Sequence, residues 1–282
     1  MSHSVSIVTG ANSGVGRAIA TALASAGEHV VMVCRSGERG EVAQREIQAS
    51  TGGGLDLVVA DLSLQVEVRR LAHHLLATYP GIKILVNNAG AIFNDRQLTA
   101  DGIEHTFALN HLASFLLTNL LLGRLRDNSP ARIVNLASNA SVFGRLSLDN
   151  LQGERSYTGL GAYARSKLAN IIFTRTLANR LQDSEVTVNC LHPGTIISHI
   201  TDHNAAPVRL YFRVFGTTAE VGADTAVWLA TSDDVAGRSG GYFIKRRERR
   251  VPRLAKNRDL AEQLWQESER LTAGPATQPV DM

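Results

Sequence analysis

The stretch that decides the fold is Thr9-Gly10-Ala11-Asn12-Ser13-Gly14-Val15-Gly16. It follows a short β-branched run, Val5 to Val8, and precedes an alanine- and leucine-rich stretch typical of a helix, Arg17 to Ala24. A strand, a glycine turn and a helix start in this order are the context in which glycines let the backbone approach a pyrophosphate. The free amides of the helix start then receive its charge, whereas the alternative is a tight turn that binds nothing. We therefore predict nucleotide contacts from Gly10, Asn12, Ser13, Gly14, Val15 and Gly16.

The second predicted strand, His29 to Cys34, ends at Arg35-Ser36. In dinucleotide-binding folds an acidic residue at this point favours the free 2′-hydroxyl of NAD, and an arginine accommodates the 2′-phosphate of NADP. The chain offers Arg35 and no acid here, so we predict NADP(H) as the cofactor, with contacts from Arg35 and Ser36. The alternative is that Arg35 is an ordinary solvated charge at a strand end.

Tyr163 and Lys167 are four residues apart, so on a helix they share one face. A tyrosine ionises near pH ~10, and a neighbouring ammonium group lowers that pKa by favouring the phenolate. A phenol tuned toward neutral pH is a general acid or base for a carbonyl/alcohol pair. The motif is common on amphipathic helices, so its interpretation depends on the nucleotide site that precedes it.

Together with Asn87-Asn88-Ala89-Gly90, these motifs resemble the short-chain dehydrogenase/reductase family, and five more look like its retinol dehydrogenase-like branch. The five are Asp61-Leu62-Ser63, Asp101-Gly102-Ile103-Glu104, Leu109-Asn110-His111-Leu112, Leu151-Gln152-Gly153-Glu154 and Ser166-Lys167-Leu168-Ala169-Asn170. The resemblance runs from Ser4 to about Leu271 and implies a single α/β domain, residues 1–271, with a Rossmann-type doubly wound parallel sheet in three layers. We expect residues 272–282 to form a flexible tail.

The resemblance assigns catalytic roles to four side chains. Ser138, which is favoured over the nearby Ser141, would bind the substrate oxygen, and Tyr163 would transfer the proton. Lys167 would bind the cofactor ribose and lower the pKa of the phenol. Asn110 would anchor a water in the proton relay, and it could also bend its helix while satisfied by a backbone carbonyl. Ala137 stands where this branch usually carries another serine.

The resemblance also assigns cofactor contacts beyond the glycine turn. Asp61 would meet the adenine amino group, and the segment after the fourth predicted strand would pass the adenine ribose. The turn after the sixth predicted strand would lie by the nicotinamide. These contacts come from Asp61, Leu62, Asn88, Ala89, Gly90, Tyr163, Lys167, Pro193, Gly194, Ile196 and Ser198.

Two segments bear on the substrate. The long stretch between Ser138 and Tyr163 would wall one side of the pocket, and residues 199–217 would form a lid. The aromatic residues of this lid either line an apolar pocket or pack on the core or on a partner subunit. We predict reduction of a ketone or aldehyde on a bulky apolar or polycyclic substrate. The alternative is a non-redox enzyme, an isomerase, cyclase or dehydratase, that uses Tyr163 as acid or base.

Composition adds few constraints. The chain has 282 residues, a net charge of +3 and 44% hydrophobic residues, as expected for one enzyme domain. The basic run 245–250 is expected to be a solvated loop after the last strand, Gly241 to Ile244, with no role in nucleic-acid binding. No apolar stretch is expected to reach the ~20 residues of a membrane span, and Met1 to Ser4 leaves no room for a signal peptide. These features favour a cytoplasmic protein.

Cysteine and histidine usage indicates a reduced protein without a metal site. Cys34 and Cys190 both fall in predicted buried strands, so we expect free thiols. His73 and His74 are adjacent and would point to different sides of a helix, which makes a poor metal pair. The family resemblance implies a homodimer or homotetramer that pairs through helices at His111–Leu125 and Ala162–Leu181.

Overall fold

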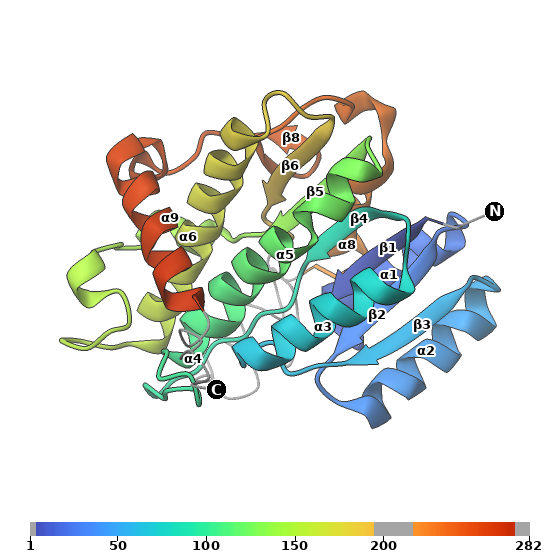
Figure 1. Cartoon of the computed structure of the whole chain (residues 1–282), viewed down its shortest axis with the longest axis horizontal. Helices are drawn as coiled ribbons and strands as arrows, with labels where there is room; N and C mark the ends of the chain where they lie inside the picture. The colour runs from blue at the N-terminus through green and yellow to red at the C-terminus, as the bar shows by residue number, and fades with distance from the viewer. Residues whose placement is uncertain (1–3, 195–216, 274–282) are drawn as a thin grey trace, which may run out of the picture.

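One eight-stranded sheet, in the order β3-β2-β1-β4-β5-β6-β7-β8, runs through the computed structural model, which describes residues 4–194 and 217–273 (Figure 1). Neighbouring strands are parallel except β7 and β8. The predicted doubly wound fold is confirmed. The strands are β1 (Val5–Thr9), β2 (His29–Cys34), β3 (Leu55–Val59), β4 (Ile82–Asn87), β5 (Ala131–Leu136), β6 (Val186–Leu191), β7 (Tyr242–Ile244) and β8 (Arg247–Glu248).

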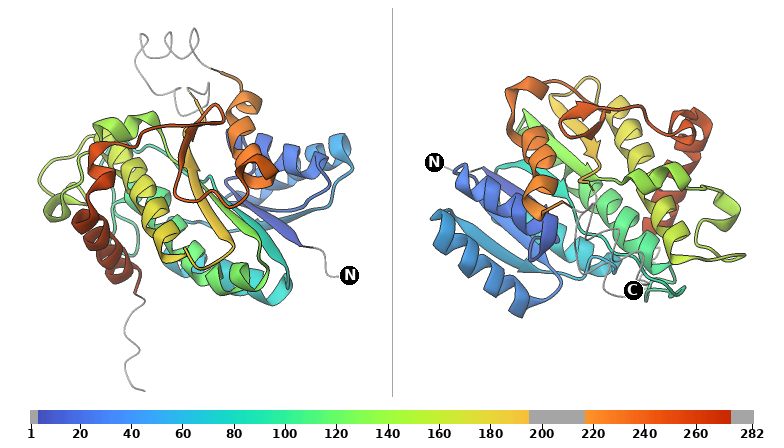
Figure 2. Two further views of the ribbon diagram at one scale, coloured as in Figure 1. Left: turned by 90° about the horizontal axis from the view of Figure 1, so that it is seen from above. Right: turned by 180° about the vertical axis from the view of Figure 1, so that it is seen from behind.

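Helices cover both faces of the sheet, which explains why the central strands are almost continuously apolar. α3, α5 and α6 pack on one face, and α1, α2 and α8 pack on the other, as the view from behind shows (Figure 2). The longer helices are α1 (Gly14–Ser25), α2 (Gly37–Thr51), α3 (Gln65–Thr78), α5 (Ala113–Asp127), α6 (Gly159–Arg180), α8 (Ala219–Thr231) and α9 (Arg258–Thr272). The short ones are α4 (His105–Phe107), η1 (Ala108–Leu112), η2 (Asn139–Phe143), η3 (Leu148–Asn150), η5 (Asp233–Val235) and η6 (Arg253–Lys256).

The strand order reverses between β1 and β4, which are neighbours although β2 and β3 come between them in sequence. In open α/β sheets the ligand lies in the crevice outside the carboxyl ends of the strands at such a switch point. The glycine turn after β1, the Asn88-Ala89-Gly90 segment after β4 and Ser138 after β5 all lie at this edge. The fold therefore gathers most of the predicted site.

The central helix is more apolar than the sequence-based expectation allowed. The segment His105–Asp127 has 23 residues, its most apolar 18-residue window has a mean hydropathy of 1.3, and the segment is long and apolar enough to cross a membrane by length and composition. The prediction that no apolar stretch approaches that length is therefore wrong. The most apolar part of this segment is 72% buried inside the protein, and the side chains of α5 pack into the core beside β4 and β5. Its apolarity is accounted for by the core.

Two boundaries at the carboxyl end also need correction. The predicted tail begins at residue 272, but Thr272 ends α9 and is 5% exposed. The basic run 245–250 is not simply a loop, because Lys245 and Arg246 form a left-handed turn (φ 50° and 57°) that leads into β8, antiparallel to β7. The run is exposed as expected, and Arg246 pairs with Asp224 of α8.

Other expectations fall outside the described residues or stay predictions. The lid at 199–217 lies outside them except for Thr217, as do Ile196 and Ser198. Cys34 and Cys190 are buried free thiols, as predicted. Pairing of two copies through His111–Leu125 and Ala162–Leu181 stays a prediction, and α9 lies against part of that surface (Figure 1).

Candidate active site

The glycine turn after β1 is shaped for close approach of a ligand. Gly10 and Gly14 have φ values of +67° and +54°, a region that favours glycine. A Cβ on Gly16 would lie 2.2 Å from the Gly10 carbonyl oxygen and 2.3 Å from Asn88 Nδ2. Gly16 therefore cannot be replaced without moving backbone, and the turn keeps an exposed backbone surface.

Helix α1 begins in this turn with its first amides free of a side-chain cap. Ser13 occupies the N-cap position in extended conformation, and its hydroxyl makes no capping hydrogen bond. Unsatisfied amides and the positive end of the helix dipole together form an anion site. Because Gly16 allows α1 to pack closely against the turn, these amides lie beside the glycine turn and fit the pyrophosphate of a dinucleotide.

A buried hydrogen-bond network, not anticipated from the sequence, connects the glycine turn to the segment after β4. Thr9 Oγ1 accepts from the amides of Asn88 and Ala89, both at 3.0 Å. Asn88 Nδ2 donates to the Thr9 carbonyl oxygen at 2.7 Å. Asn88 was predicted as a cofactor contact, and the structure shows that its side chain holds two cofactor-facing loops together.

The end of β2 presents a group of arginines. Arg35 is exposed, and Ser36 caps α2 by accepting from the Arg39 amide at 3.4 Å. A cavity of about 270 Å³ lies next to the glycine turn, lined by Asn12, Arg17, Glu38, Arg39, Val42 and Ala43. Arg17 pairs with Glu46 at 2.7 Å. Arg17 and Arg39 were not among the predicted contacts, although their positions after the glycine turn and after Arg35 offered a signal.

The remaining described cofactor candidates lie at the ends of β3, β4 and β6. Asp61 Oδ1 accepts from the amide and the hydroxyl of Ser63, at 3.0 and 2.7 Å, which fixes its carboxylate. Leu62 is buried in the core, so its contribution to a ligand would come from the backbone. Pro193 and Gly194 are half-buried directly after β6.

The four predicted catalytic residues converge on the carboxyl edge of the sheet. Tyr163 and Lys167 lie on α6, with Lys167 Nζ 5.6 Å from the centre of the Tyr163 ring, and the Ser138 side chain is near enough to Tyr163 to lower the pKa of its phenol. A Cβ on Gly90 would meet Asn110 Oδ1 at 3.0 Å and Lys167 Nζ at 3.3 Å. Gly90 thus lies between two of the catalytic side chains, and the predicted group is brought together.

Burial dominates the electrostatics of this group. It raises the pKa of Tyr163, and the hydrogen bond with Ser138 acts in the opposite direction. Burial also lowers the pKa of Lys167 to about 8, and its Nζ donates to the Leu136 carbonyl oxygen at 2.9 Å. The prediction that Lys167 lowers the pKa of the phenol is therefore wrong for this arrangement. Desolvation outweighs a lysine that is directed toward the end of β5.

Asn110 lies in a π-helical turn, η1, between α4 and α5. Its Oδ1 accepts from the Ala91 amide at 2.8 Å, and its Nδ2 donates to the Ala91 carbonyl oxygen and to Ser166 Oγ, both at 3.0 Å. The alternative of an irregular helix with a backbone-bonded asparagine is therefore confirmed. Asn110 Oδ1 has one further acceptor position, and its role in a proton relay stays a prediction.

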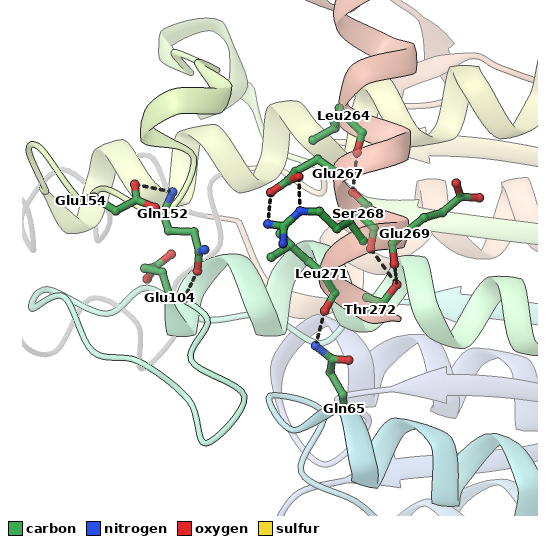
Figure 3. A network of polar contacts seen from close by, with 11 residues as sticks. Gln65, Glu104, Gln152, Glu154, Leu264, Glu267, Ser268, Glu269, Leu271 and Thr272 are labelled. Atoms are coloured by element: carbon green, nitrogen blue, oxygen red, sulfur yellow. Dashed lines mark hydrogen bonds and ion pairs between the residues drawn. The ribbon is translucent and has the colours of Figure 1, made fainter. Parts of the chain in front are cut away.

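The other tyrosine near the site has a structural partner. Tyr157 donates to the Phe93 carbonyl oxygen at 2.8 Å and contacts Glu104, which caps α4. Gln152 Oε1 accepts from the Glu104 amide at 2.9 Å, so the segment between Ser138 and Tyr163 is tied to the loop after β4 (Figure 3). Tyr157 therefore braces the segment between Ser138 and Tyr163 against the loop after β4.

The fold and the site together define a dinucleotide-binding oxidoreductase. The short chain dehydrogenase family profile matches residues 4–208, and the chain belongs to this family. It is 41% identical to retinol dehydrogenase 11 of Mus musculus over 264 residues, 93% of this chain and 84% of the relative. Retinol dehydrogenase 12 of Mus musculus is similar to the same degree, 41% identical over 265 residues and the same shares of both chains.

Solved structures of related proteins share the fold. A Mycobacterium Paratuberculosis protein superposes with a TM-score of 0.78 at 33% identity, covering 95% of this chain and 93% of that one. A protein from Beutenbergia cavernae, assigned as an NAD(P)-dependent gluconate 5-dehydrogenase and containing bound NADP, gives 0.70 at 30% identity, covering 87% and 96%. The resemblance to the retinol dehydrogenase-like branch is confirmed.

Proposed function

We propose that the protein is an NADP(H)-dependent reductase of a ketone or aldehyde carried by a bulky apolar molecule. The observation that carries this proposal is the convergence of Ser138, Tyr163, Lys167 and Asn110 beside the uncapped start of α1. At the carboxyl edge of the sheet, the glycine turn and the start of α1 fit a pyrophosphate, and the four side chains fit a reacting oxygen. NADP(H), when bound, supplies the hydride.

The chain's own residues orient the carbonyl and manage its proton. Ser138 and Tyr163 would both hydrogen-bond the carbonyl oxygen, and Tyr163 would donate its proton there. Lys167, one helical turn away, is placed to hold ribose hydroxyls beside Gly90. Asn110 holds the water that returns a proton to Tyr163.

Burial keeps the Tyr163 phenol protonated, which is the form that donates to a carbonyl oxygen during reduction. A raised pKa also makes the phenol a weaker acid, so the reductive direction rests on the proposed NADP(H) preference and not on this pKa.

NADP(H) preference rests on positive charge at the end of β2. Arg35 is exposed there, Arg39 follows in the first turn of α2, and Arg17 lines the neighbouring cavity. Arginine binds phosphate oxygens through charge-assisted, often bidentate hydrogen bonds. Glu38 lines the same cavity and Glu46 pairs with Arg17, so we assign Arg35 and Arg39 the main contact with a 2′-phosphate.

Exposed apolar side chains near the catalytic group support an apolar substrate. Val142 and Phe143, on η2 after Ser138, are 67% and 81% exposed, and Leu160 in the first turn of α6 is 66% exposed. Large apolar side chains in such positions are typical of a surface that binds a ligand. Since the relatives include retinol dehydrogenases, we propose the retinal/retinol pair, or an isoprenoid of similar shape, as substrate.

A titration and a turnover assay test this function together. The cofactor-free protein is titrated with NADPH and with NADH while protein fluorescence is followed, and clearly tighter binding of NADPH is expected. Reduction of all-trans-retinal is then followed by product formation and NADPH consumption, which should be stoichiometric. Conversion of retinal to a product of the same oxidation level, without NADPH consumption, would instead establish the non-redox alternative. Binding of neither dinucleotide would exclude an oxidoreductase.

A further inference from the structure

The C-terminal helix α9 is attached to the outer side of the catalytic helix α6 by several kinds of contact. Trp265 packs against Phe115 and Phe173, with ring centres 5.0 and 5.9 Å apart. The Arg180 guanidinium of α6 lies 4.1 Å from the centre of the Trp265 ring and pairs with Glu262 at 2.8 Å. Cation–π and ion-pair contacts together give α9 one position on α6.

The carboxyl end of α9 is held by α3, far away in sequence. Gln65 Nε2 donates to the Leu271 carbonyl oxygen at 2.6 Å (Figure 3). Arg69 donates to the carbonyl oxygen of Thr272. These donors satisfy carbonyls that a helix end leaves free, and the Arg69 charge complements the helix dipole. The helix is thus fixed both along its side and at its end.

From this fixed helix a hydrogen-bond chain runs inward to the catalytic region. Ser268 Oγ of α9 lies 3.0 Å from His111 Nε2, and His111 Nδ1 lies 3.1 Å from Asn170 Oδ1. His111 is fully buried, and Asn170 and Ser268 are 2% and 1% exposed. His111 directly follows Asn110 in the π-helical turn.

The direction of each hydrogen bond follows from the chemistry of the groups. Asn170 Nδ2 donates to the carbonyl oxygens of Asn110, at 2.9 Å, and Leu136, at 3.3 Å, so Oδ1 is the atom that faces His111. Because Oδ1 only accepts, His111 Nδ1 carries the proton. Burial lowers the pKa of His111 to about 4, so the ring is neutral and Nε2 is an acceptor. The Ser268 hydroxyl lies 3.0 Å from this Nε2 and 2.7 Å from the Leu264 carbonyl oxygen of α9, so the two acceptors share its one hydrogen.

The inner end of this chain meets two parts of the active site. The Asn110 carbonyl that Asn170 binds belongs to the residue whose side chain holds Ala91 and Ser166. The Leu136 carbonyl that Asn170 binds also accepts from Lys167 Nζ. Asn170 therefore connects the supports of two catalytic side chains.

We propose that His111, supported by Ser268 and acting through Asn170, is a positioning residue that holds Asn110 and Lys167 in place, so that turnover depends on the docked α9. The proposal builds on the proposed reductase function for its kinetic consequence. Its structural consequence, support of the π-helical turn by α9, is independent of the substrate.

The test uses Ser268→Ala with Thr272→Val as its matched control. Both remove a buried hydroxyl that donates to a carbonyl oxygen of α9 (Figure 3). They differ because the Ser268 hydroxyl also lies 3.0 Å from His111 Nε2, whereas the Thr272 hydroxyl bonds carbonyl oxygens within α9. With NADPH and all-trans-retinal, Ser268→Ala is expected to lower kcat about three- to tenfold, the usual effect of one hydrogen bond, with KM for NADPH unchanged. Thr272→Val should keep the wild-type kcat. Activity is expressed per NADPH-binding site, which removes any unfolded fraction.

Two readouts separate positioning from a merely structural role. If Asn110 is displaced, proton return becomes slower, and the solvent deuterium isotope effect on kcat should rise in Ser268→Ala but not in Thr272→Val. His111→Asn keeps a donor for Asn170 and His111→Leu does not, so the asparagine variant should retain the higher kcat. The proposal would be overturned if Ser268→Ala and Thr272→Val had equal solvent isotope effects and His111→Asn and His111→Leu had equal kcat.

Amide hydrogen exchange keeps the proposal testable if no carbonyl probe turns over. In the peptide that contains Ala108–Leu112, Ser268→Ala should exchange faster than the wild type and Thr272→Val should not. Unchanged exchange in Ser268→Ala would overturn the inference whatever the activity. Faster exchange in a protein that binds no NADPH would support the connection and disprove only the proposed reductase.

Discussion

The glycine turn after β1 and the helices α5, α6 and α9 serve the same active site, but they are built in different ways. The turn is made by backbone: two left-handed glycines, one glycine without room for a Cβ, and uncapped amides, all between Gly10 and Gly16. The helices act through side chains that join distant positions, 59 apart for His111 and Asn170 and 157 apart for His111 and Ser268. A backbone site is therefore a local motif, whereas a side-chain site is assembled only by the fold.

The sharpest test of the site that is built from side chains is Tyr163→Phe, which removes only the hydroxyl proposed to react. Turnover should fall by about 10²–10⁴-fold, the range for loss of a general acid, while NADPH binding and thermal unfolding stay close to wild type. The matched control is Tyr157→Phe, whose hydroxyl braces Phe93 and should leave most of kcat. Near-wild-type turnover of Tyr163→Phe, measured by NADPH absorbance, would remove Tyr163 from the mechanism.

The corresponding test of the backbone half is Gly16→Ala. The added Cβ would meet backbone at 2.2 Å, so the turn must shift, and we expect NADPH affinity to fall about 100-fold with a stability loss of about 1–3 kcal/mol. Gly123→Ala is the control, because that glycine is exposed in α5 with nothing near its Cβ. It should leave NADPH affinity unchanged and stabilise the protein by about 0.5–1 kcal/mol. Calorimetric titration measures the NADPH affinity, and urea unfolding measures the stability. If neither changed in Gly16→Ala, the turn would tolerate a side chain at this position.

The same contrast explains how much was predictable from the sequence. A run rich in β-branched residues predicted β2 (His29–Cys34) at its observed bounds, because strands buried on both faces are almost continuously apolar. The glycine turn and the Tyr163–Lys167 spacing are local patterns and were predictable for that reason. The Thr9–Asn88 network joins residues 79 positions apart and left no local pattern.

What the sequence did not reveal depends on burial. Whether Lys167 lowers the pKa of Tyr163 depends on where its ammonium group points, and the Leu136 carbonyl of β5 decides this. The length of α9 depends on Gln65 and Arg69 of α3, which hold the end that was predicted to be a tail. The apolar segment His105–Asp127 resembles a membrane helix until the sheet is placed against it.

The burial of Lys167 has a consequence for stability. Its pKa falls from 10.5 to about 8 on folding, so between these pH values the unfolded chain binds a proton that the folded protein does not. The contribution of Lys167 to stability therefore rises with pH across this window, by up to about 3 kcal/mol. Urea unfolding of wild type and Lys167→Met between pH 8 and 10.5 checks this, because other titrating groups cancel in the difference. Parallel pH profiles would show that the ammonium group is better solvated than its position indicates.

The smallest effect is expected at Arg35. It is an exposed side chain after β2, and it is the one contact of the predicted cofactor site that this test removes. Arg35→Ala should weaken NADPH binding about tenfold, as for loss of one charge-assisted hydrogen bond, and leave NADH binding unchanged because NADH lacks the 2′-phosphate. Lys83→Ala is the control, since Lys83 is equally exposed but lies near the amino end of β4, at the opposite edge of the sheet. Parallel fluorescence titrations of each variant with both dinucleotides measure the ratio of affinities. If Arg35→Ala kept the preference for NADPH over NADH, that preference would come from Arg17 and Arg39. The cofactor site, like the catalytic site, would then depend on side chains that the fold brings together.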